Sequence, residues 1–363
     1  MKAIVLCAGE GTRLRPISFT GPKHLIPIAN KPIVLHIIES IVDAGIHEVG
    51  LIINRGWESA FRDALASAAA RMNIRIEFVY QDEPLGLAHA AACAHDFVAD
   101  EPFLMYLGDN LLEKGVNGIV SRYNEGGLNA VISLYAVDNP SAFGVAELED
   151  ARIVRVVEKP KEPKSNWAIM GVYLFDSHVF EVIDNLKPSW RGEYEITDAI
   201  QGLIDRGLTV APHFVEGWWL DAGTPEDMIQ ANRRKLLKLA NNSRTDVGTV
   251  IWDECRASEL PEGTVVRNSE LRGPVIIGAN CQIIDSYIGP FTSIGDGVTV
   301  IDSEVENSIL LNGCQIRDFG PRLDKSIIGR RARLTATVAG VGSSASTFIL
   351  ADDSVVNLRQ GCA

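Results

Sequence analysis

The sequence predicts an α/β fold, a doubly wound and mainly parallel sheet, followed by a β-helix. Over the first 240 residues, short apolar runs alternate with segments of helical periodicity. This alternation is typical of a parallel sheet with helices on both faces. Beyond residue 241, branched apolar residues recur about every six positions, as in a β-helix whose coils contain three short strands each. We therefore expect two domains, 1–240 and 241–363.

Six apolar runs are the expected strands of the first domain. They are 3–7, 48–53, 74–80, 103–107, 130–136 and 210–215. Helical patterns follow the first two, at 31–45 and 57–72. A further helix begins at Thr224-Pro225-Glu226-Asp227, where an N-cap residue precedes a proline and two acids, and it should end near Leu239. Ligands of such folds bind at the carboxyl ends of strands, so the loops there are the candidate site.

The β-helix prediction depends on the spacing of apolar residues, with small or polar residues at Ile-Gly corners between them. The spacing is six, with two slips to five, along Ile277, Ile283, Ile288, Ile294, Val300 and Val305. The less regular stretch 318–363 is expected to form the terminal coils or a cap. The alternative is an ordinary β-sandwich, in which a period of six with Ile-Gly corners is hard to obtain.

Composition and charge limit the possible partners. The 363 residues are 46% apolar and carry a net charge of −13, which argues against binding to nucleic acid or to an anionic membrane. No apolar run approaches the ~18 residues of a membrane helix, and the first residues lack the apolar core of a signal peptide. The simplest expectation is a cytoplasmic protein that acts on small molecules.

The loop after the first strand suits a polyphosphate. Gly9 and Gly11 allow close approach of the backbone, and Arg13 and Lys23 supply a planar fork and a mobile charge. Two familiar phosphate motifs do not fit. Leu14 stands where a dinucleotide fingerprint needs its third glycine, and the chain contains no P-loop string.

Two carboxylates come from distant segments. Asp109 follows the apolar run that ends at Leu107, and Asp221 precedes the helix that starts at Pro225. Together they could hold one Mg²⁺, which prefers few carboxylates plus phosphate and water.

Three further motifs carry polar groups suited to a nucleotide and a sugar. Gln81 offers a donor and an acceptor for the edge of a pyrimidine, and Gly86 would let the backbone approach the base. Gly144 lies in a Phe-Gly-Val string. Glu158 and Lys159 could accept sugar hydroxyls and hold a sugar phosphate, respectively.

The combined strings identify a family resemblance. G-x-G-T-R-L-x-P from Gly9, P-K-x-L-x-P from Pro22 and the Asn30-Lys31-Pro32 triplet resemble the signature of sugar-1-phosphate nucleotidylyltransferases. With the later motifs and the string KPSWRGEYEITD over 187–198, the chain resembles the long form of glucose-1-phosphate thymidylyltransferases. That resemblance implies a Rossmann-like catalytic domain and a left-handed parallel β-helix.

The resemblance also implies roles for individual residues. The catalytic residues would be Arg13, Lys23, Asp109 and Asp221, and both aspartates would hold Mg²⁺. Nucleotide would be bound by Leu6, Ala8, Gly9, Gly11, Thr12, Gln81, Pro84 and Gly86. Sugar phosphate would be bound by Asn110, Gly144, Glu158, Lys159, Tyr173 and Arg191, with Thr197 near the same pocket.

The implied reaction transfers a nucleotidyl group from an NTP, with dTTP expected, to a sugar 1-phosphate, with glucose 1-phosphate expected. UTP or another NTP, with a different sugar or cyclitol phosphate, is the alternative. Gly21, His36 and the Asn54-Arg55-Gly56 loop depart from the common family pattern and leave these preferences open.

Two rivals belong to other classes. One is a bifunctional enzyme with an acyltransferase β-helix, which the absence of histidine after His213 disfavours. The other is a non-catalytic regulatory subunit, although the four catalytic positions are all present. The expected role of the β-helix is formation of a homo-oligomer.

Overall fold

The computed structural model describes residues 1–150, 152–239, 244–251, 260–337 and 345–359. The chain divides into two compact units that interleave along the sequence. The first contains Met1–Gly9 and Val34–Asp221, and the second contains Glu10–Ile33 and Ala222–Ala363. The boundary expected at 240/241 falls outside the described residues and stays a prediction.

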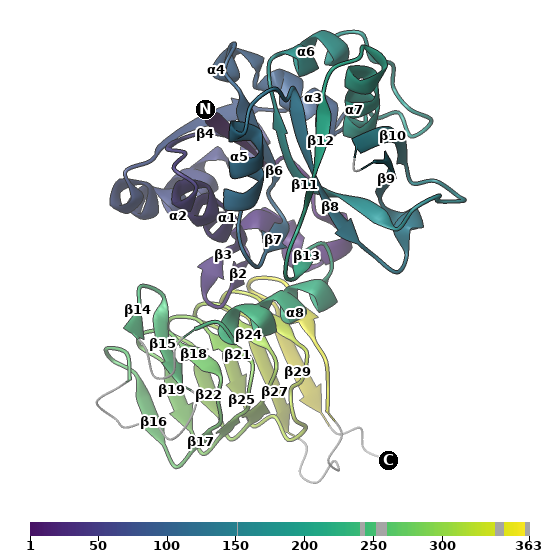
Figure 1. Ribbon diagram of the computed structural model, residues 1–363. Helices are drawn as coiled ribbons and strands as arrows, with labels where there is room; N and C mark the ends of the chain where they lie inside the picture. The colour runs from purple at the N-terminus through teal and green to yellow at the C-terminus, as the bar shows by residue number, and fades with distance from the viewer. Residues whose placement is uncertain (151, 240–243, 252–259, 338–344, 360–363) are drawn as a thin grey trace. The chain divides into compact units, whose positions relative to one another are not determined.

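The first unit contains a nine-stranded mixed sheet of order β10-β9-β11-β6-β1-β4-β5, to which β8 is joined through β11 and β12 through β8 (Figure 1). Its strands are β1 (Lys2–Leu6), β4 (Glu48–Ile53), β5 (Arg75–Tyr80), β6 (Phe103–Leu107), β8 (Ala130–Ala136), β9 (Gly144–Glu149), β10 (Arg152–Glu158), β11 (Trp167–Phe175) and β12 (Val210–Phe214). Strands β5, β4, β1 and β6 are parallel, whereas β11 is antiparallel to β6 and β8. The carboxyl ends of the four parallel strands therefore meet at one edge of the sheet.

Helices cover this sheet. They are α1 (Ile33–Asp43), α2 (Glu58–Met72), α3 (Leu87–Cys93), α4 (His95–Val98), α5 (Asn117–Asn124), α6 (His178–Ile183) and α7 (Ile196–Asp205). On one face, Ile4 and Leu6 of β1 share a core with residues of α3, α6 and α7. Ala3 and Val5, which point to the opposite face, are also fully buried. Burial on both faces explains why β1 is a continuous apolar run.

All six expected strands are confirmed, with ends that differ by at most one residue. The antiparallel part formed by β9, β10 and β11 was not expected. In β11 the pairing with β8 shifts between Ile169 and Tyr173, and β10 carries a shift between Ile153 and Arg155. Such irregularities disturb the period-two pattern from which a strand is inferred.

The second unit begins with three short 3₁₀ helices, η1 (Thr12–Leu14), η2 (Ile17–Phe19) and η3 (Lys23–Leu25). A small hairpin of β2 (Pro27–Ile28) and β3 (Lys31–Pro32) follows. Helix α8 (Pro225–Leu236) starts as expected, because Thr224 Oγ1 accepts a hydrogen bond from the Asp227 N–H at 3.2 Å. It ends at Leu236, three residues before the expected end. Residues 237–239, which were expected to be helical, form a turn and a bend.

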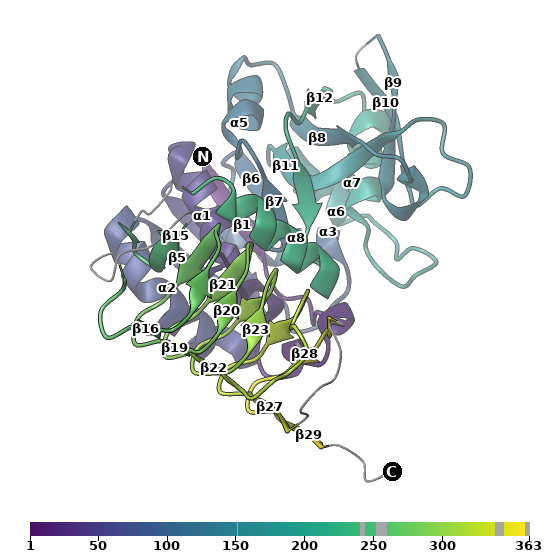
Figure 2. The same ribbon diagram turned by 90° about the horizontal axis from the view of Figure 1, so that it is seen from below.

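The rest of this unit is a β-helix of successive parallel coils (Figures 1 and 2). A seven-stranded sheet begins with β14 (Arg244–Thr245) and β15 (Gly248–Ile251), which pair antiparallel with each other, and β15 is also antiparallel to the next strand. Its remaining strands are parallel: β18 (Val275–Ile277), β21 (Thr292–Ile294), β24 (Ile309–Leu310), β26 (Ile327–Ile328) and β28 (Ile349–Leu350). A six-stranded sheet contains β16 (Val265–Arg267), β19 (Gln282–Ile284), β22 (Thr299–Ile301), β25 (Gln315–Arg317), β27 (Arg333–Thr337) and β29 (Val355–Arg359), and a three-stranded sheet contains β17 (Glu270–Leu271), β20 (Tyr287–Ile288) and β23 (Glu304–Val305).

The six-residue spacing corresponds to the stacking of these coils. Ile277 pairs with Ile294, Ile283 with Val300, and Ile288 with Val305, and all six side chains are fully buried. The two residues of each pair are 17 positions apart in the sequence, so one coil contains 17 residues. These 17 residues correspond to two six-residue steps and one five-residue step of the apolar pattern. The predicted β-helix is thus confirmed, and the fold class is an α/β sheet covered by helices, followed by a left-handed parallel β-helix.

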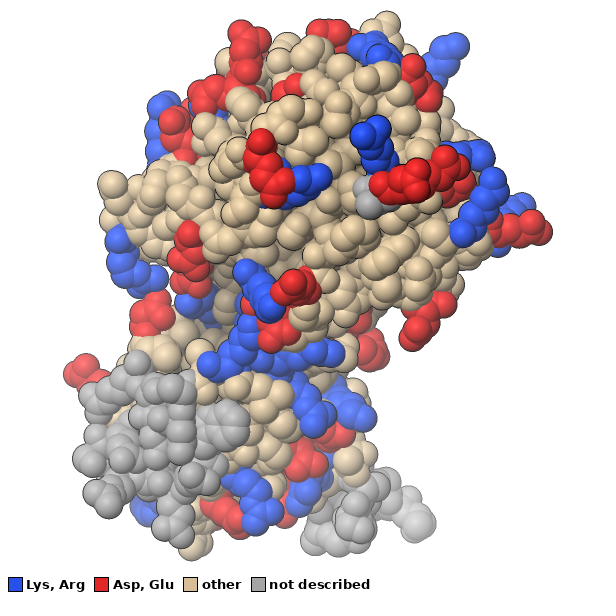
Figure 3. All heavy atoms as spheres, in the orientation of Figure 1, with Lys and Arg blue, Asp and Glu red and all other residues tan. Residues whose placement is uncertain are grey.

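Basic and acidic side chains are mixed over the visible surface, and basic ones gather over α8 (Figure 3). This helix carries Arg233, Arg234 and Lys235 in its last turn, where cations interact favourably with the helix dipole. Within the described ranges, none of the helices combines the length and the apolar character needed to span a membrane.

Candidate active site

Gly11 and Lys23 lie against each other in the loop that follows β1. The backbone of Gly11 is left-handed, with a φ of 64°, and a Cβ placed there would lie 3.2 Å from Cβ of Lys23. A side chain at position 11 would therefore be strained and would press on Lys23. Ser18 donates its hydroxyl to the Gly11 carbonyl oxygen at 2.8 Å and holds the turn, and Thr12 begins η1 directly after it.

Arg13 is placed by a second glycine. A Cβ on Gly223 would lie 2.5 Å from Nη2 of Arg13, so the guanidinium rests against the backbone just before the N-cap of α8. Gly223 is therefore needed for this contact. It lies between Asp221 and the predicted start of the helix, but nothing in the sequence indicated Arg13 as its partner.

Leu6, Ala8 and Gly9 lie in the first unit at the end of β1. The carbonyl oxygen of Leu6 accepts a hydrogen bond from the Gly108 N–H at 2.9 Å. Ala8 packs partly buried on the core, and Gly9 is exposed. The end of β1 is thus joined directly to the residue that precedes Asp109.

Asp109 and Asp221 are brought to neighbouring positions by a two-stranded sheet of β7 (Asn110–Leu112) and β13 (Trp219–Asp221). In its register Asp221 lies opposite Asn110. Asn110 is buried, donates Nδ2 to Asp109 Oδ1 at 2.9 Å and accepts Trp219 Nε1–H at 2.7 Å. Two carboxylates fit Mg²⁺, which completes its coordination with water and phosphate.

Gln81 is buried directly after β5, with an exposed fraction of 7%. Its backbone N–H bonds to the Ile53 carbonyl oxygen at 3.0 Å, and its side-chain Nε2 lies 3.1 Å from the Gly86 carbonyl oxygen and 3.0 Å from His89 Nδ1. Pro84 is exposed in the same loop. Gln81 is therefore a fixed group rather than a solvated strand end.

Gly86 is required for the closure of this loop. Its φ is 107°, and a Cβ there would lie 2.6 Å from the backbone oxygen of Tyr194. Tyr194 in turn donates its N–H to the Leu85 carbonyl oxygen at 2.8 Å and accepts from the Ala88 N–H at 3.0 Å. The loop that carries Gln81 and Gly86 is thus held to the segment that carries Arg191.

Glu158 is the centre of a polar cluster that contains the residues expected to bind the sugar phosphate. It pairs with Gly144 across β10 and β9, and it accepts the Thr197 hydroxyl at 3.2 Å. Lys159 Nζ lies 3.8 Å from Glu158 Oε1, and Arg191 Nη1 lies 3.5 Å from the same oxygen. A Cβ on Gly144 would come within 2.6 Å of Thr197, so glycine at this position leaves room for that bond.

Arg191 also contacts two carboxylates that the sequence analysis did not single out. Its Nη2 lies 3.0 Å from Glu193 and its Nη1 3.4 Å from Glu195. Glu195 is only 4% exposed and also accepts the Ser189 hydroxyl at 2.9 Å. Both acids were visible in the RGEYE string, but nothing in the sequence separated a buried acid from an exposed one.

Burial shifts the pKa values of this cluster. The pKa of Glu158 is raised, first by loss of solvation and then by the neighbouring charge of Glu195, against the opposing effect of Lys159. Tyr173 is buried, and desolvation followed by the charge of Glu158 raises its pKa well above the ordinary value. The cluster therefore places a protonated tyrosine beside a carboxylate that is costly to ionise.

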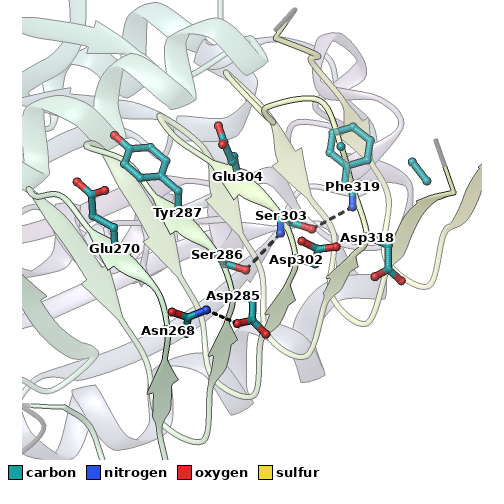
Figure 4. A pocket seen from close by; sticks show the side chains of 12 residues that line it. Asn268, Glu270, Asp285, Ser286, Tyr287, Asp302, Ser303, Glu304, Asp318 and Phe319 are labelled. Atoms are coloured by element: carbon teal, nitrogen blue, oxygen red, sulfur yellow. Dashed lines mark hydrogen bonds between the residues drawn. The ribbon is translucent and has the colours of Figure 1, made fainter. Parts of the chain in front are cut away.

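The β-helix carries an open hollow of about 770 Å³ (Figure 4). Asp285, Asp302 and Asp318 succeed one another along it, each at a left-handed corner of the coil, with Tyr287 on another part of its rim. Stacked corner residues in this conformation are a structural need of the coil, because Asn and Asp tolerate it best. The lining contains no histidine that could serve an acyltransferase as a base.

Comparison with known proteins identifies the family of this chain. Residues 2–237 match the family model described as Nucleotidyl transferase. The chain is 42% identical over 363 residues to a glucose-1-phosphate thymidylyltransferase of Streptomyces antibioticus, and the match covers 99% of this chain and 100% of that protein. It is 36% identical over 237 residues to the UTP–glucose-1-phosphate uridylyltransferase AglF of Haloferax volcanii, covering 64% of this chain and 96% of that one.

A solved structure is similar to the catalytic part. The crystal structure of a protein described as a glucose-1-phosphate thymidylyltransferase from Bacillus anthracis, in complex with a sucrose, matches with a TM-score of 0.61 and 34% identity. The match covers 67% of this chain and 98% of that one. This chain therefore belongs to the nucleotidyl transferase family and is a nucleotidyltransferase of the sugar-1-phosphate type, in the long form that continues into a β-helix.

Proposed function

We propose that this enzyme transfers a thymidylyl group from dTTP to glucose 1-phosphate, giving dTDP-glucose and pyrophosphate. The observation that carries the proposal is the register of β7 and β13, which places Asp221 opposite the residue that follows Asp109. Carboxylates from segments more than a hundred residues apart thus lie together near the end of β1. The full-length similarity to a thymidylyltransferase supports the choice of substrates.

In the proposed reaction an oxygen of the sugar phosphate attacks the α-phosphorus of the nucleotide. The new P–O bond forms as the bond to the β-phosphate oxygen breaks, and pyrophosphate leaves with those electrons. The nucleophile is ionised at neutral pH, so no general base is needed. Catalysis is then alignment and neutralisation of charge, which is the work assigned to Arg13 and Lys23 on the nucleotide phosphates.

On the sugar side, Lys159 and Arg191 neutralise the phosphate while Glu158 accepts sugar hydroxyls. Thr197 orients Glu158 through its hydroxyl. Gly144 has no side chain that would clash with Thr197, so the hydrogen bond between Thr197 and Glu158 can form. Asp109 and Asp221 would hold Mg²⁺, with Asn110 orienting Asp109. When bound, the metal supplies positive charge to the reacting phosphates.

The choice of base is assigned to Gln81. Its Nε2 is engaged with Gly86 and His89, so its Oε1 is the atom left to accept the N3–H of uracil or thymine. Cytosine has an acceptor at that position. UTP is the second candidate nucleotide, supported by the similarity to a uridylyltransferase over the catalytic part.

The test is release of pyrophosphate with Mg²⁺, crossing dTTP, UTP, GTP, ATP and CTP against several sugar 1-phosphates. Fast turnover confined to dTTP or UTP with glucose 1-phosphate supports the proposal. Activity only with another sugar or cyclitol phosphate would keep the mechanism and replace the substrate. A chain inactive with every pair would contradict the proposed reaction.

We also propose that the β-helix supports a homo-oligomer. Light scattering on the full chain and on a chain ending at residue 242 tests this. An unchanged number of subunits after truncation would contradict it.

A further inference from the structure

Asn232 of α8 joins three segments of the second unit through one buried amide. Its side chain is 1% exposed, and its Oδ1 accepts the backbone N–H of Ala29 at 2.7 Å and the hydroxyl of Ser293 at 2.6 Å. Its Nδ2 donates to the Phe291 carbonyl oxygen at 3.0 Å. Ala29 is in the turn of the β2–β3 hairpin, and Ser293 is in β21 of the β-helix. A helix, a hairpin and a coil thus share one side chain.

Asn30, the next residue of that turn, makes a second connection. Its Nδ2 donates to the Ile294 carbonyl oxygen at 2.7 Å and to the Val247 carbonyl oxygen at 3.2 Å. Ala29 and Asn30 both have left-handed backbones, with φ values of 49° and 60°. The turn is therefore bent sharply, and the Ala29 N–H and the Asn30 amide are satisfied by α8 and the β-helix.

The contact is also apolar. Ala29, Leu236, Val250 and Ile276 form a buried cluster, with Phe291 packed against it. The ring of Phe291 is covered by the guanidinium of Arg233 at 4.2 Å. The β2–β3 hairpin, α8 and the neighbouring coils of the β-helix therefore pack as one body. They are held together by apolar contacts in addition to the hydrogen bonds of Asn30 and Asn232.

Lys23 is tied to this hairpin by a very short stretch of chain. Its 3₁₀ turn ends at Leu25, and β2 begins at Pro27. The intervening Ile26 is buried, donates its N–H to the Lys23 carbonyl oxygen at 3.1 Å and accepts from the Ile33 N–H at 3.2 Å. A displacement of the hairpin would therefore be passed to Lys23 with little loss.

We propose that Asn232 and Asn30 are positioning residues through which the β-helix sets the location of Lys23 for the nucleotide phosphates. The part of this inference that concerns phosphate rests on the proposed function. The β-helix then takes part in nucleotide binding, in addition to any role in assembly.

The test compares Asn30→Gly and Asn232→Ala with the unmodified chain. Glycine at position 30 accepts the left-handed backbone and removes only the amide. Asn268→Gly is the matched control, because Asn268 is also left-handed and donates its amide to Asp285 at 2.6 Å within the β-helix. Steady-state kinetics give the KM of each substrate, and hydrogen exchange reports residues 23–33.

We expect each test variant to raise the KM for the nucleotide about tenfold, because a small misplacement of a binding group is costly. The KM for the sugar phosphate in the test variants should stay within about twofold of that of the unmodified chain. In the Asn268→Gly control, the KM for the nucleotide and the KM for the sugar phosphate should both stay within the same range. Exchange over 23–33 should become faster in the test variants alone. In a Lys23→Ala background, Asn232→Ala should raise the KM for the nucleotide no further.

Three results would overturn the inference, and the last two concern nucleotide binding rather than exchange. One is exchange over 23–33 that does not change in either variant, which would mean that the hairpin is held by other contacts. The second is faster exchange with an unchanged KM for the nucleotide, and the third is an equal effect in the Lys23→Ala background. Hydrogen exchange does not depend on turnover. If the unmodified chain turned over no nucleotide, the proposed function would be contradicted, but the role of Asn30 and Asn232 in holding the hairpin could still be measured by exchange.

Discussion

Nε2 of Gln81 lies within hydrogen-bonding distance of both the Gly86 carbonyl oxygen and His89 Nδ1, at 3.1 and 3.0 Å. One amide has two hydrogens, so both are taken when Nδ1 of His89 is the acceptor. The orientation of Gln81 is then fixed, and its oxygen is the atom that we propose accepts a hydrogen bond from the base. Under that proposal, His89 would affect base choice by orienting Gln81.

We expect His89→Ala to weaken discrimination between keto pyrimidines and cytosine. The freed amide can rotate and present a donor to the N3 acceptor of cytosine. The ratio of kcat/KM for dTTP to that for CTP should fall about tenfold, which is the scale of one net hydrogen bond. Measurement of both nucleotides with the same sugar phosphate gives this ratio.

A double-mutant cycle supplies the control. If His89 acts only by orienting Gln81, its replacement should leave the ratio unchanged once Gln81 is already alanine. An equal effect of His89→Ala in both backgrounds would show that the histidine acts by another route.

Asp109→Asn should lower kcat by about 10²–10³-fold while the chain stays folded, because a group that neutralises charge at reacting phosphates is lost. Mg²⁺ titration should also show a weaker dependence on the metal. Asp318→Asn, an acid at a corner of the β-helix, is the control and should be neutral. Full activity of Asp109→Asn would remove Asp109 from the metal site.

Lys23→Ala should raise the KM for the nucleotide and lower kcat, with the melting temperature nearly unchanged. Its charge is proposed to hold the polyphosphate, and no other lysine lies in the Gly9–Pro27 stretch. Raised ionic strength should weaken nucleotide binding less in the variant than in the unmodified chain, because one attraction is already absent. Equal salt dependence in both chains would argue against a phosphate contact.

The parallel half of the sheet and the β-helix could be predicted from the sequence because burial there requires a recognisable pattern of apolar residues. β1 is buried on both faces and is a continuous apolar run, and the coil core repeats from Ile277 to Ile294. Gly11 and Gly86 were found by their motifs, and both have the positive φ that makes glycine necessary.

What could not be predicted is which distant polar groups meet. Asn30 bonds to a residue 264 positions away, and although both segments carry recognisable motifs, neither motif indicates the other as its partner. Glu195 is buried whereas Glu193, two residues before it, is partly exposed, although both residues are glutamates. Pairing across the fold, rather than local preference, decides these cases.

Glu195→Gln should raise the KM for the sugar phosphate about tenfold and leave that for the nucleotide unchanged. Arg191 would lose one of the three carboxylates that hold it. The same change should lower the pKa of Glu158, because the charge of Glu195 helps to raise it. The acid limb of kcat/KM for the sugar phosphate should therefore move to lower pH, relative to the unmodified chain.

Glu158→Gln should make the protein more stable at pH 8 while impairing use of the sugar phosphate. Burial and Glu195 raise the pKa of Glu158 in the folded state above its value in the unfolded chain. The folded state thus binds the proton more tightly, and stability is lost as pH rises from the unfolded value through the folded one. Glutamine is neutral at every pH and avoids this loss, although it gives up the ion pairs with Lys159 and Arg191.

Melting temperatures of the two chains across pH 5 to 8 measure the effect. The advantage of Glu158→Gln should be largest at pH 8 and should shrink on acidification, because the glutamate then gains its proton. A constant difference at all pH values would mean that the change acts through packing. A lower melting temperature of the variant at pH 8 would mean that Lys159 and Arg191 outweigh burial, which contradicts a raised pKa.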